Sequence, residues 1–150
     1  MWTMPPEWRP PSATWMGFPT GAYDTAGVSD NDVFDAWSAV ANTISEHEPV
    51  HMLCHPQRLA VAQKKLASSV TLHAFEIDDA WMRDSGPTFV TGEHGLGGID
   101  WIFNGWGDHT AFDWSQDAKV ASHIIELTGA KRFESDLVNE GGGLHVSGQG

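Results

Sequence analysis

The segment from residue 78 to residue 90, DDAWMRDSGPTFV, carries the residue types best suited to chemistry in this 150-residue chain. It contains three aspartates, a tryptophan and an arginine, namely Asp78, Asp79, Asp84, Trp81 and Arg83. Carboxylates can accept hydrogen bonds along the edge of a flat cation while an indole covers its face. The Ser-Gly-Pro run that follows predicts a turn that fixes these side chains at the end of a strand. The segment therefore indicates a site for a planar cation.

A purely structural interpretation of the same residues stays open. Aspartates at corners often cap turns or accept backbone amides, and Asp79 and Asp84 have the residue type for that role. Arg83 would then form an ion pair that holds the corner, and Trp81 would be an ordinary core residue.

Two further segments are candidates for a binding site. In NGWGDHTAFDW, residues 104–114, two glycines flank Trp106 and permit tight backbone geometry, so the indole either walls a pocket or packs its own loop. In NEGGGLHVSGQG, residues 139–150, three glycines leave the Glu140 carboxylate beside bare backbone that a ligand can approach. The second segment lacks the Lys-Ser/Thr pair of a phosphate loop, and its glutamate would repel phosphate.

Cys54 is the only cysteine, which excludes an internal disulfide. It lies near His51 and His55, but a strand would point His51 and Cys54 to opposite faces, and no second Cys/His cluster completes four metal ligands. We expect Cys54 to be a buried structural residue, and we expect no metal and no cofactor.

The chain is acidic, with eight Lys plus Arg, twenty Asp plus Glu and a formal charge of −12. This balance argues against nucleic acid or an anionic membrane as a partner and suits a small cationic partner. An alternative is that the acidic residues only keep the protein soluble. No signal peptide or membrane span is apparent, so we expect a cytoplasmic protein.

Strand and helix patterns alternate along the chain, which predicts an α/β fold. After an extended, proline-rich entry segment over 1–19, we expect helices over 30–48, 56–67 and 113–128, and strands over 49–54, 70–77, 88–91, 97–104, 136–139 and 144–146. Ser29 or Asp30 can cap the first helix, Asp113 and Gln116 resemble a capping box for the third, and Gly129 ends it. His94-Gly95 predicts a turn between two strands.

Five segments in register resemble the agmatine deiminases and their relatives, the bacterial peptidylarginine deiminases. These are MPPEWRPPSATWMGFP (4–19), DDAWMRDSGPTFV (78–90), GIDWIFNGWG (98–107), DWSQDAKVA (113–121) and NEGGGLHVSGQG (139–150). The resemblance implies a partial pentein, an α/β propeller of ββαβ units, of which this chain would hold about the first two. Residues 1–150 would then be the N-terminal part of a single, longer catalytic domain.

The resemblance also implies a reaction and residue roles. The family hydrolyses a guanidinium group: agmatine plus water gives N-carbamoylputrescine plus ammonia, a step toward putrescine. By position in the motifs, Asp84 is the carboxylate that binds the guanidinium, Trp81 lines the substrate channel, and Asp79, Trp106 and Glu140 are further substrate-binding candidates. The family's nucleophilic cysteine lies in a Gly-Cys-Gly-Asn-like motif and its histidine in a Gly-His-x-Asp motif. Neither motif occurs here, so we expect the chain alone to be inactive.

Three alternatives stay open. The first is a peptidylarginine deiminase, the second a non-catalytic module that binds a cationic ligand, and the third a structural piece whose acidic corner only holds the fold. A homo-oligomer is compatible with each. We expect the isolated 150 residues to associate, because part of a propeller leaves strand edges uncovered.

Overall fold

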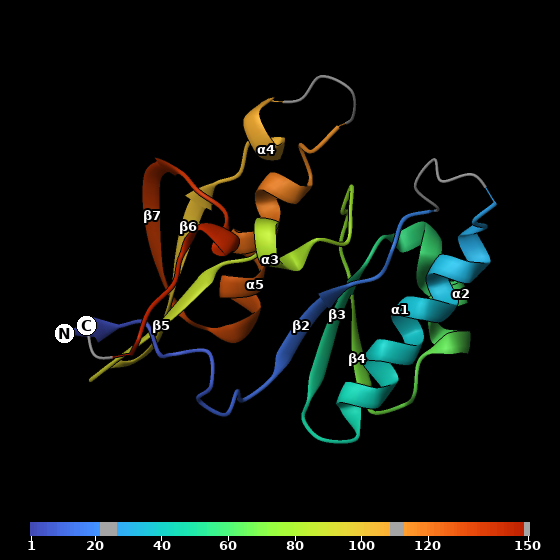
Figure 1. Cartoon of the computed structure of the whole chain (residues 1–150), viewed down its shortest axis with the longest axis horizontal. Helices are drawn as coiled ribbons and strands as arrows, with labels where there is room; N and C mark the ends of the chain where they lie inside the picture. The colour runs from blue at the N-terminus through green and yellow to red at the C-terminus, as the bar shows by residue number, and fades with distance from the viewer. Residues whose placement is uncertain (22–26, 109–112, 149–150) are drawn as a thin grey trace. The chain divides into compact units, whose positions relative to one another are not determined.

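A computed structural model of the chain describes residues 1–21, 27–108 and 113–148 (Figure 1). The chain forms two compact units: unit 1 comprises Met1–Pro10 and Arg83–Gly150, and unit 2 comprises Pro11–Met82. Each unit combines a sheet with helices, so the predicted α/β class is confirmed.

Unit 2 is built on a three-stranded parallel sheet with the strand order β2-β3-β4. Helices connect successive strands, as parallel pairing requires. Along the chain the elements are β2 (Thr14–Gly17), α1 (Asp30–Ser45), β3 (Val50–Cys54), the 3₁₀ turn η1 (Pro56–Arg58), α2 (Leu59–Lys65) and β4 (Val70–Ala74). Part of the predicted entry segment thus forms an edge strand of this sheet, β2.

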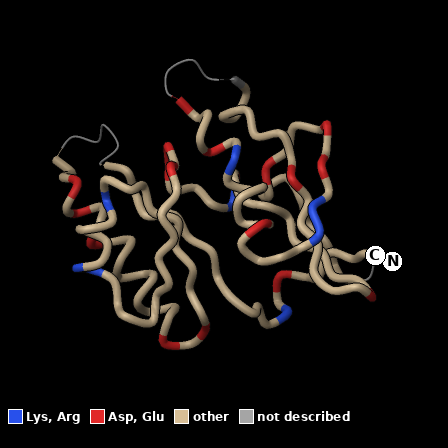
Figure 2. The backbone as a smooth tube through the Cα atoms, turned by 180° about the vertical axis from the view of Figure 1, so that it is seen from behind, with Lys and Arg blue, Asp and Glu red and all other residues tan. Residues whose placement is uncertain are grey.

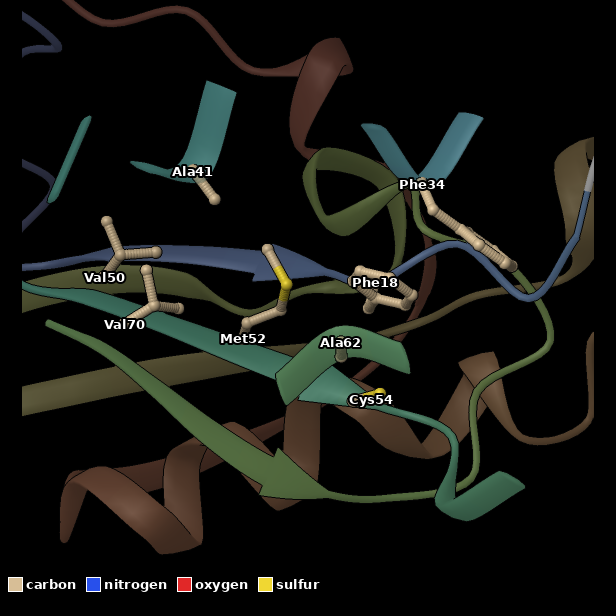
Figure 3. Packing of buried hydrophobic residues seen from close by; sticks show 8 residues of the cluster. All are labelled: Phe18, Phe34, Ala41, Val50, Met52, Cys54, Ala62 and Val70. Atoms are coloured by element: carbon tan, nitrogen blue, oxygen red, sulfur yellow. The ribbon is translucent and has the colours of Figure 1, made fainter. Parts of the chain in front are cut away.

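The core of unit 2 lies between this sheet and its helices. Alternate residues of β3 supply Val50, Met52 and Cys54, as the two-residue period of a strand requires (Figure 3). The other members of the cluster are Phe18, Phe34, Ala41, Ala62 and Val70. Cys54 is fully buried, which confirms its predicted structural role.

The first helix begins where its capping signal predicts and ends earlier than expected. Ser29 accepts a hydrogen bond from the Asp32 amide at 3.2 Å, and the Asp32 carboxylate accepts one from the Ser29 amide at 2.8 Å. The predicted end at residue 48 is wrong, because α1 stops at Ser45. Pro49 disfavours the helical conformation at Glu48, so the chain leaves the helix before it reaches the proline.

Unit 1 contains a four-stranded mixed sheet with the order β1-β5-β6-β7. Its strands are β1 (Trp2–Thr3), β5 (Thr88–Gly92), β6 (Gly95–Ile102) and β7 (Lys131–Val138). The first three pair antiparallel, whereas β6 and β7 are parallel and are joined through α5 (Val120–Thr128). The run β5-β6-α5-β7 therefore has the expected ββαβ order.

Two local predictions in unit 1 are confirmed and one is wrong. The predicted hairpin turn is present one residue earlier than expected, at 93–94, and Gly95, at φ 110°, is the first residue of β6. Gly129 ends α5 in the left-handed conformation at φ 65°. The predicted helix start at Asp113 is wrong: its carboxylate accepts the Ser115 amide at 2.9 Å in a local turn. A 3₁₀ turn, η2 (Asp117–Lys119), then leads into α5 without a side-chain cap.

Several predicted strand limits also differ from the structure. The expected strand over 144–146 is absent: the 3₁₀ turn η3 (Gly141–Gly143) is followed by extended chain that pairs with no strand among the described residues. Strand β7 begins at residue 131 rather than 136, β6 spans 95–102 rather than 97–104, and β4 ends at 74 rather than 77. The predicted helix over 56–67 is divided into η1 and α2. The polar, exposed sequence of β7 explains why its apolar pattern was weak.

Acidic residues occur throughout both units rather than in one run (Figure 2). Within the described parts of the chain, none of the helices combines the length and the apolar character needed to cross a lipid bilayer.

Candidate functional site

Asp84 lies on α3 (Met82–Ser85), a single helical turn that ends directly before Gly86 and Pro87. The side chain is half-buried and accepts a hydrogen bond from the Trp106 side chain. Burial raises the pKa of the Asp84 carboxyl above its ordinary value, and it outweighs the lowering by the Trp106 hydrogen bond and the Arg83 charge. Asp84 is therefore a carboxylate with less solvation than its charge favours.

Trp106 is held in a strained conformation next to Asp84. Its φ of 57° makes it the one non-glycine residue with positive φ in the described ranges, and Gly105 and Gly107 on either side have φ of 61° and 105°. These residues belong to the short turn α4 (Gly105–Asp108), in which the Asn104 carboxamide accepts the Gly107 amide at 3.0 Å. Such strain persists only where the surroundings enforce it, and it is common at binding sites.

Aromatic packing keeps this turn in place. The Trp106 ring meets Phe103 edge to face at 5.3 Å between centroids, and Phe103 also contacts Trp114 at 6.5 Å. A Cβ atom on Gly105 would lie 2.3 Å from the Trp114 ring, so only glycine fits against this ring. The glycines permit the predicted tight geometry, and the Trp106 ring packs against Phe103. Whether Trp106 also walls a binding site stays a prediction. Residues 109–112 of the segment lie outside the described residues.

Glu140 follows β7 and precedes the three glycines of η3. Its side chain is half-buried and caps no helix, although it occupies the N-cap position. A Cβ on Gly141 would lie 2.6 Å from the Arg83 carbonyl oxygen, so the backbone after Glu140 runs against the backbone before Asp84. Glycine at 141 thus lets two predicted site segments, distant in sequence, lie side by side.

Asn139 was not predicted as a site residue. Its side-chain nitrogen, Nδ2, is buried and, within the described chain, has no hydrogen-bond partner, an unusual state for a buried donor. Its carboxamide oxygen would lie 3.0 Å from a Cβ on Gly143, so the side chain lies over the glycine turn. The signal in the sequence that could have identified Asn139 is its position immediately before Glu140, a predicted site residue.

Arg83 forms an ion pair with Glu7 of the entry segment rather than with an aspartate of its own corner. The hydrogen bond and charge of Arg83 lower the pKa of the Glu7 carboxyl. The structural ion pair considered for Arg83 therefore exists, but its partner is Glu7. The Asp84 carboxylate accepts a hydrogen bond from Trp106 instead.

Asp79 and Trp81 belong to unit 2. The Asp79 carboxylate accepts the Ala80 amide at 2.6 Å, which is the local role that its structural interpretation gives it. Trp81 is 44% exposed and contacts Trp37 of α1 edge to face at 5.9 Å, so it is not an ordinary core residue.

The remaining candidates offer little chemistry. Burial raises the pKa of the Cys54 thiol to about 11, so the reactive thiolate is scarce at neutral pH. His51 Nδ1 lies 3.0 Å from His73 Nε2, and Trp15 stacks on both rings. Among the residues described, no group of three or more His, Cys, Asp or Glu side chains is arranged to hold a metal ion.

Comparison with known proteins gives consistent matches along the chain. The family model described as Porphyromonas-type peptidyl-arginine deiminase matches residues 3–150. A protein from Streptomyces coelicolor named "Putative agmatine deiminase" is 46% identical over 98% of this chain, which spans only 44% of that relative.

Solved structures agree with the sequence matches. The structure of an agmatine deiminase of Enterococcus faecalis matches 99% of this chain and 42% of its own, with a TM-score of 0.91 and 35% identity. A substrate-bound C315S agmatine deiminase from C. jejuni has a TM-score of 0.82 at 21% identity and supports the fold alone. The chain thus has a partial pentein fold, as predicted.

Proposed function

We propose that this chain, which belongs to the Porphyromonas-type peptidyl-arginine deiminase family, is part of an enzyme that hydrolyses the guanidinium group of agmatine. The observation that carries the proposal is the state of the Asp84 carboxylate. It is half-buried and poorly solvated, and it accepts a hydrogen bond from the Trp106 indole. A cation that donates N–H groups supplies what this carboxylate lacks.

The chemistry requires such a carboxylate. A guanidinium is planar and poorly electrophilic, because its charge is spread over three nitrogens. By accepting hydrogen bonds from those nitrogens, Asp84 orients the carbon for attack and keeps positive charge on the group under attack. The hydrogen bond from Trp106 fixes the carboxylate in turn. Asp84 is thus the proposed catalytic residue of this chain.

The other predicted residues receive substrate-binding roles in the proposal. Trp106 and Glu140 are supported by their positions in turns that lie against Asp84 or its neighbour Arg83. Asp79 and Trp81 take their roles from their positions in the family motif. Both units would belong to one catalytic domain; homo-oligomerisation and a cytoplasmic location stay predictions.

The nucleophile must come from outside these residues. Cys54 is the only cysteine, and it is fully buried with a raised pKa. In the proposed reaction a cysteine thiolate from the rest of the protein attacks the guanidinium carbon and ammonia leaves. Water then adds to the amidino-thioether, which breaks the C–S bond, gives N-carbamoylputrescine and regenerates the thiolate.

Peptidyl-arginine is a second candidate substrate, because the matching family model is described by that activity. Steady-state ammonia release by the full-length protein, measured with agmatine, with free arginine and with arginine-containing peptides, separates the two. We expect the highest kcat/KM with agmatine. A higher value with peptides would assign the second activity. No turnover of any guanidine would leave the binding module and the purely structural piece as the remaining alternatives.

The Asp84→Asn variant tests the proposed catalytic residue. We expect hydrolysis to fall by roughly 10²–10³-fold, as on removal of other electrostatic transition-state contacts. The melting temperature at pH 7 should not fall, because the raised pKa means that the buried anion destabilises the native state above the ordinary aspartate pKa. Asp136→Asn, on exposed β7, is the matched control. Near-normal turnover by Asp84→Asn would refute the assignment.

A further inference from the structure

Arg83 raises a problem for the proposed site, because it is itself a guanidinium. It precedes the carboxylate that is meant to bind a substrate guanidinium, and its charge already lowers the pKa of Asp84. An arginine side chain is long enough and mobile enough to pair with a neighbouring carboxylate. Left alone, Arg83 would compete with the substrate for Asp84.

The structure directs Arg83 elsewhere. Successive side chains on a helical turn leave the backbone in different directions, so Arg83 reaches Asp84 only when its long side chain bends back. The Arg83 guanidinium pairs with Glu7, a residue 76 positions earlier in the chain. The Arg83 side chain runs past Gly141, where a Cβ atom would lie in ordinary van der Waals contact with that side chain, at 3.4 Å from Cδ and 3.6 Å from Nε.

We propose that Glu7 is a positioning residue, which holds the Arg83 guanidinium away from Asp84 and so keeps that carboxylate available to a guanidinium substrate. The proposal rests on the proposed function and adds a role for the entry segment. Glu7 does not touch substrate. It acts through Arg83, by removing an internal competitor of the same chemical class as the substrate.

The ion pair is suited to this role and poorly suited to stabilising the fold. The side chains of Arg83 and Glu7 are 60% and 51% exposed, and ion pairs that solvent reaches contribute little to folding stability. Removal of the Glu7 carboxylate should therefore leave the protein folded while it releases Arg83. A change in substrate binding can then be measured without loss of the native state.

The test compares four full-length proteins: wild type, Glu7→Ala, Arg83→Met and the double variant. In Glu7→Ala, pairing of Arg83 with Asp84 should raise KM for agmatine by roughly two- to sixfold, the competition expected from one exposed ion pair. The kcat value should not change, since saturating substrate displaces Arg83. In the double variant KM should return to the Arg83→Met value.

A matched control distinguishes this role from general loss of surface charge. Glu134 pairs with Arg132 at 3.0 Å on β7, and it is also an exposed glutamate in an ion pair. Glu134→Ala should leave KM unchanged. If Glu7→Ala leaves KM unchanged, or if the double variant keeps the raised KM, Glu7 does not act by withholding Arg83 and the proposal is wrong.

A second measurement separates this proposal from the proposed function. The carboxyl ¹³C resonance of Asp84, assigned through Asp84→Asn, reports its titration whether or not the protein turns over any guanidine. We expect Glu7→Ala to lower the pKa of Asp84, because Arg83 then pairs with it, and the added Arg83→Met change to raise it again. An unchanged titration in Glu7→Ala would overturn the proposal even in an active enzyme.

Discussion

Replacement of Gly105 by alanine should both destabilise the protein and disturb the candidate site. At φ 61°, an alanine costs about 1–2 kcal/mol relative to glycine. Its Cβ would lie 2.3 Å from Cδ1 and 2.7 Å from Cγ and Nε1 of Trp114, a rigid ring, and such overpacking costs about 1–3 kcal/mol. We therefore expect a loss of roughly 2–5 kcal/mol in the free energy of unfolding, measured by urea denaturation.

Gly129→Ala isolates the contribution of the contact. Gly129 has almost the same backbone conformation, at φ 65°, but nothing lies within 4 Å of its Cβ position. We expect this variant to lose only the backbone cost, about 1–2 kcal/mol. Equal destabilisation by the two variants would refute the reasoning, because the packing of Gly105 against Trp114 would then contribute nothing.

The same substitution should change the pH dependence of the site. A shift at Gly105 moves the following residue, Trp106, whose hydrogen bond lowers the pKa of Asp84. Loss of that bond raises the pKa further, so the acid limb of kcat/KM should move to higher pH in Gly105→Ala and stay in place in Gly129→Ala. An unmoved acid limb would show that Trp106 keeps its contact without Gly105.

Two predictions concern the core of unit 2. Met52 is fully buried, so Met52→Ala should destabilise the protein by about 2–5 kcal/mol in urea denaturation; a loss below about 1 kcal/mol would contradict the packing shown in Figure 3. The pKa of about 11 at Cys54 predicts that iodoacetamide at pH 8 does not alkylate Cys54 in the native protein and alkylates it rapidly after denaturation. Rapid labelling of Cys54 in the native state would disprove its burial.

Predictions from the sequence succeeded where one segment decides its own conformation. The Ser29 cap of α1, the left-handed Gly129 and the turn before Gly95 depend on interactions within a few residues. The same local reasoning failed at Asp113, whose carboxylate has two possible local uses. In the structure this carboxylate accepts a hydrogen bond from the Ser115 amide in a local turn and does not cap a helix.

Predictions failed where a distant partner decides. Strand β1 exists because Trp2 and Thr3 pair with Gly92 and Thr91, and no periodicity in two residues can reveal that. Strand β7 pairs with β6 through a parallel register that includes Lys131 and Arg132, charged residues whose pattern does not indicate a strand. The expected strand over 144–146 has apolar residues but no partner among the described strands.

In the candidate site, too, the sequence predicts single residues but not the contacts between distant ones. The motifs nominated Asp84, Trp106 and Glu140 separately, but the hydrogen bond between Asp84 and Trp106 required the fold. Glu7 lies within the first quoted motif, yet nothing local marks a glutamate as the partner of Arg83. Charge complementarity across 76 residues becomes visible only when the chain is folded.

Under the proposed function, burial decides which carboxylate of unit 1 selects a guanidinium. Glu7 and Arg83 form an exposed pair, in which water screens the charges and the pKa of Glu7 is already lowered by its partner. Asp84 is half-buried and its raised pKa reflects lost hydration, so a cation that reaches it interacts in a medium of lower dielectric constant. The excess of acidic residues, twenty against eight basic ones, attracts any cation to the surface and distinguishes none. In the proposed function, selection therefore arises at Asp84, because its carboxylate is poorly solvated, whereas the Glu7 carboxylate is exposed and already paired with Arg83.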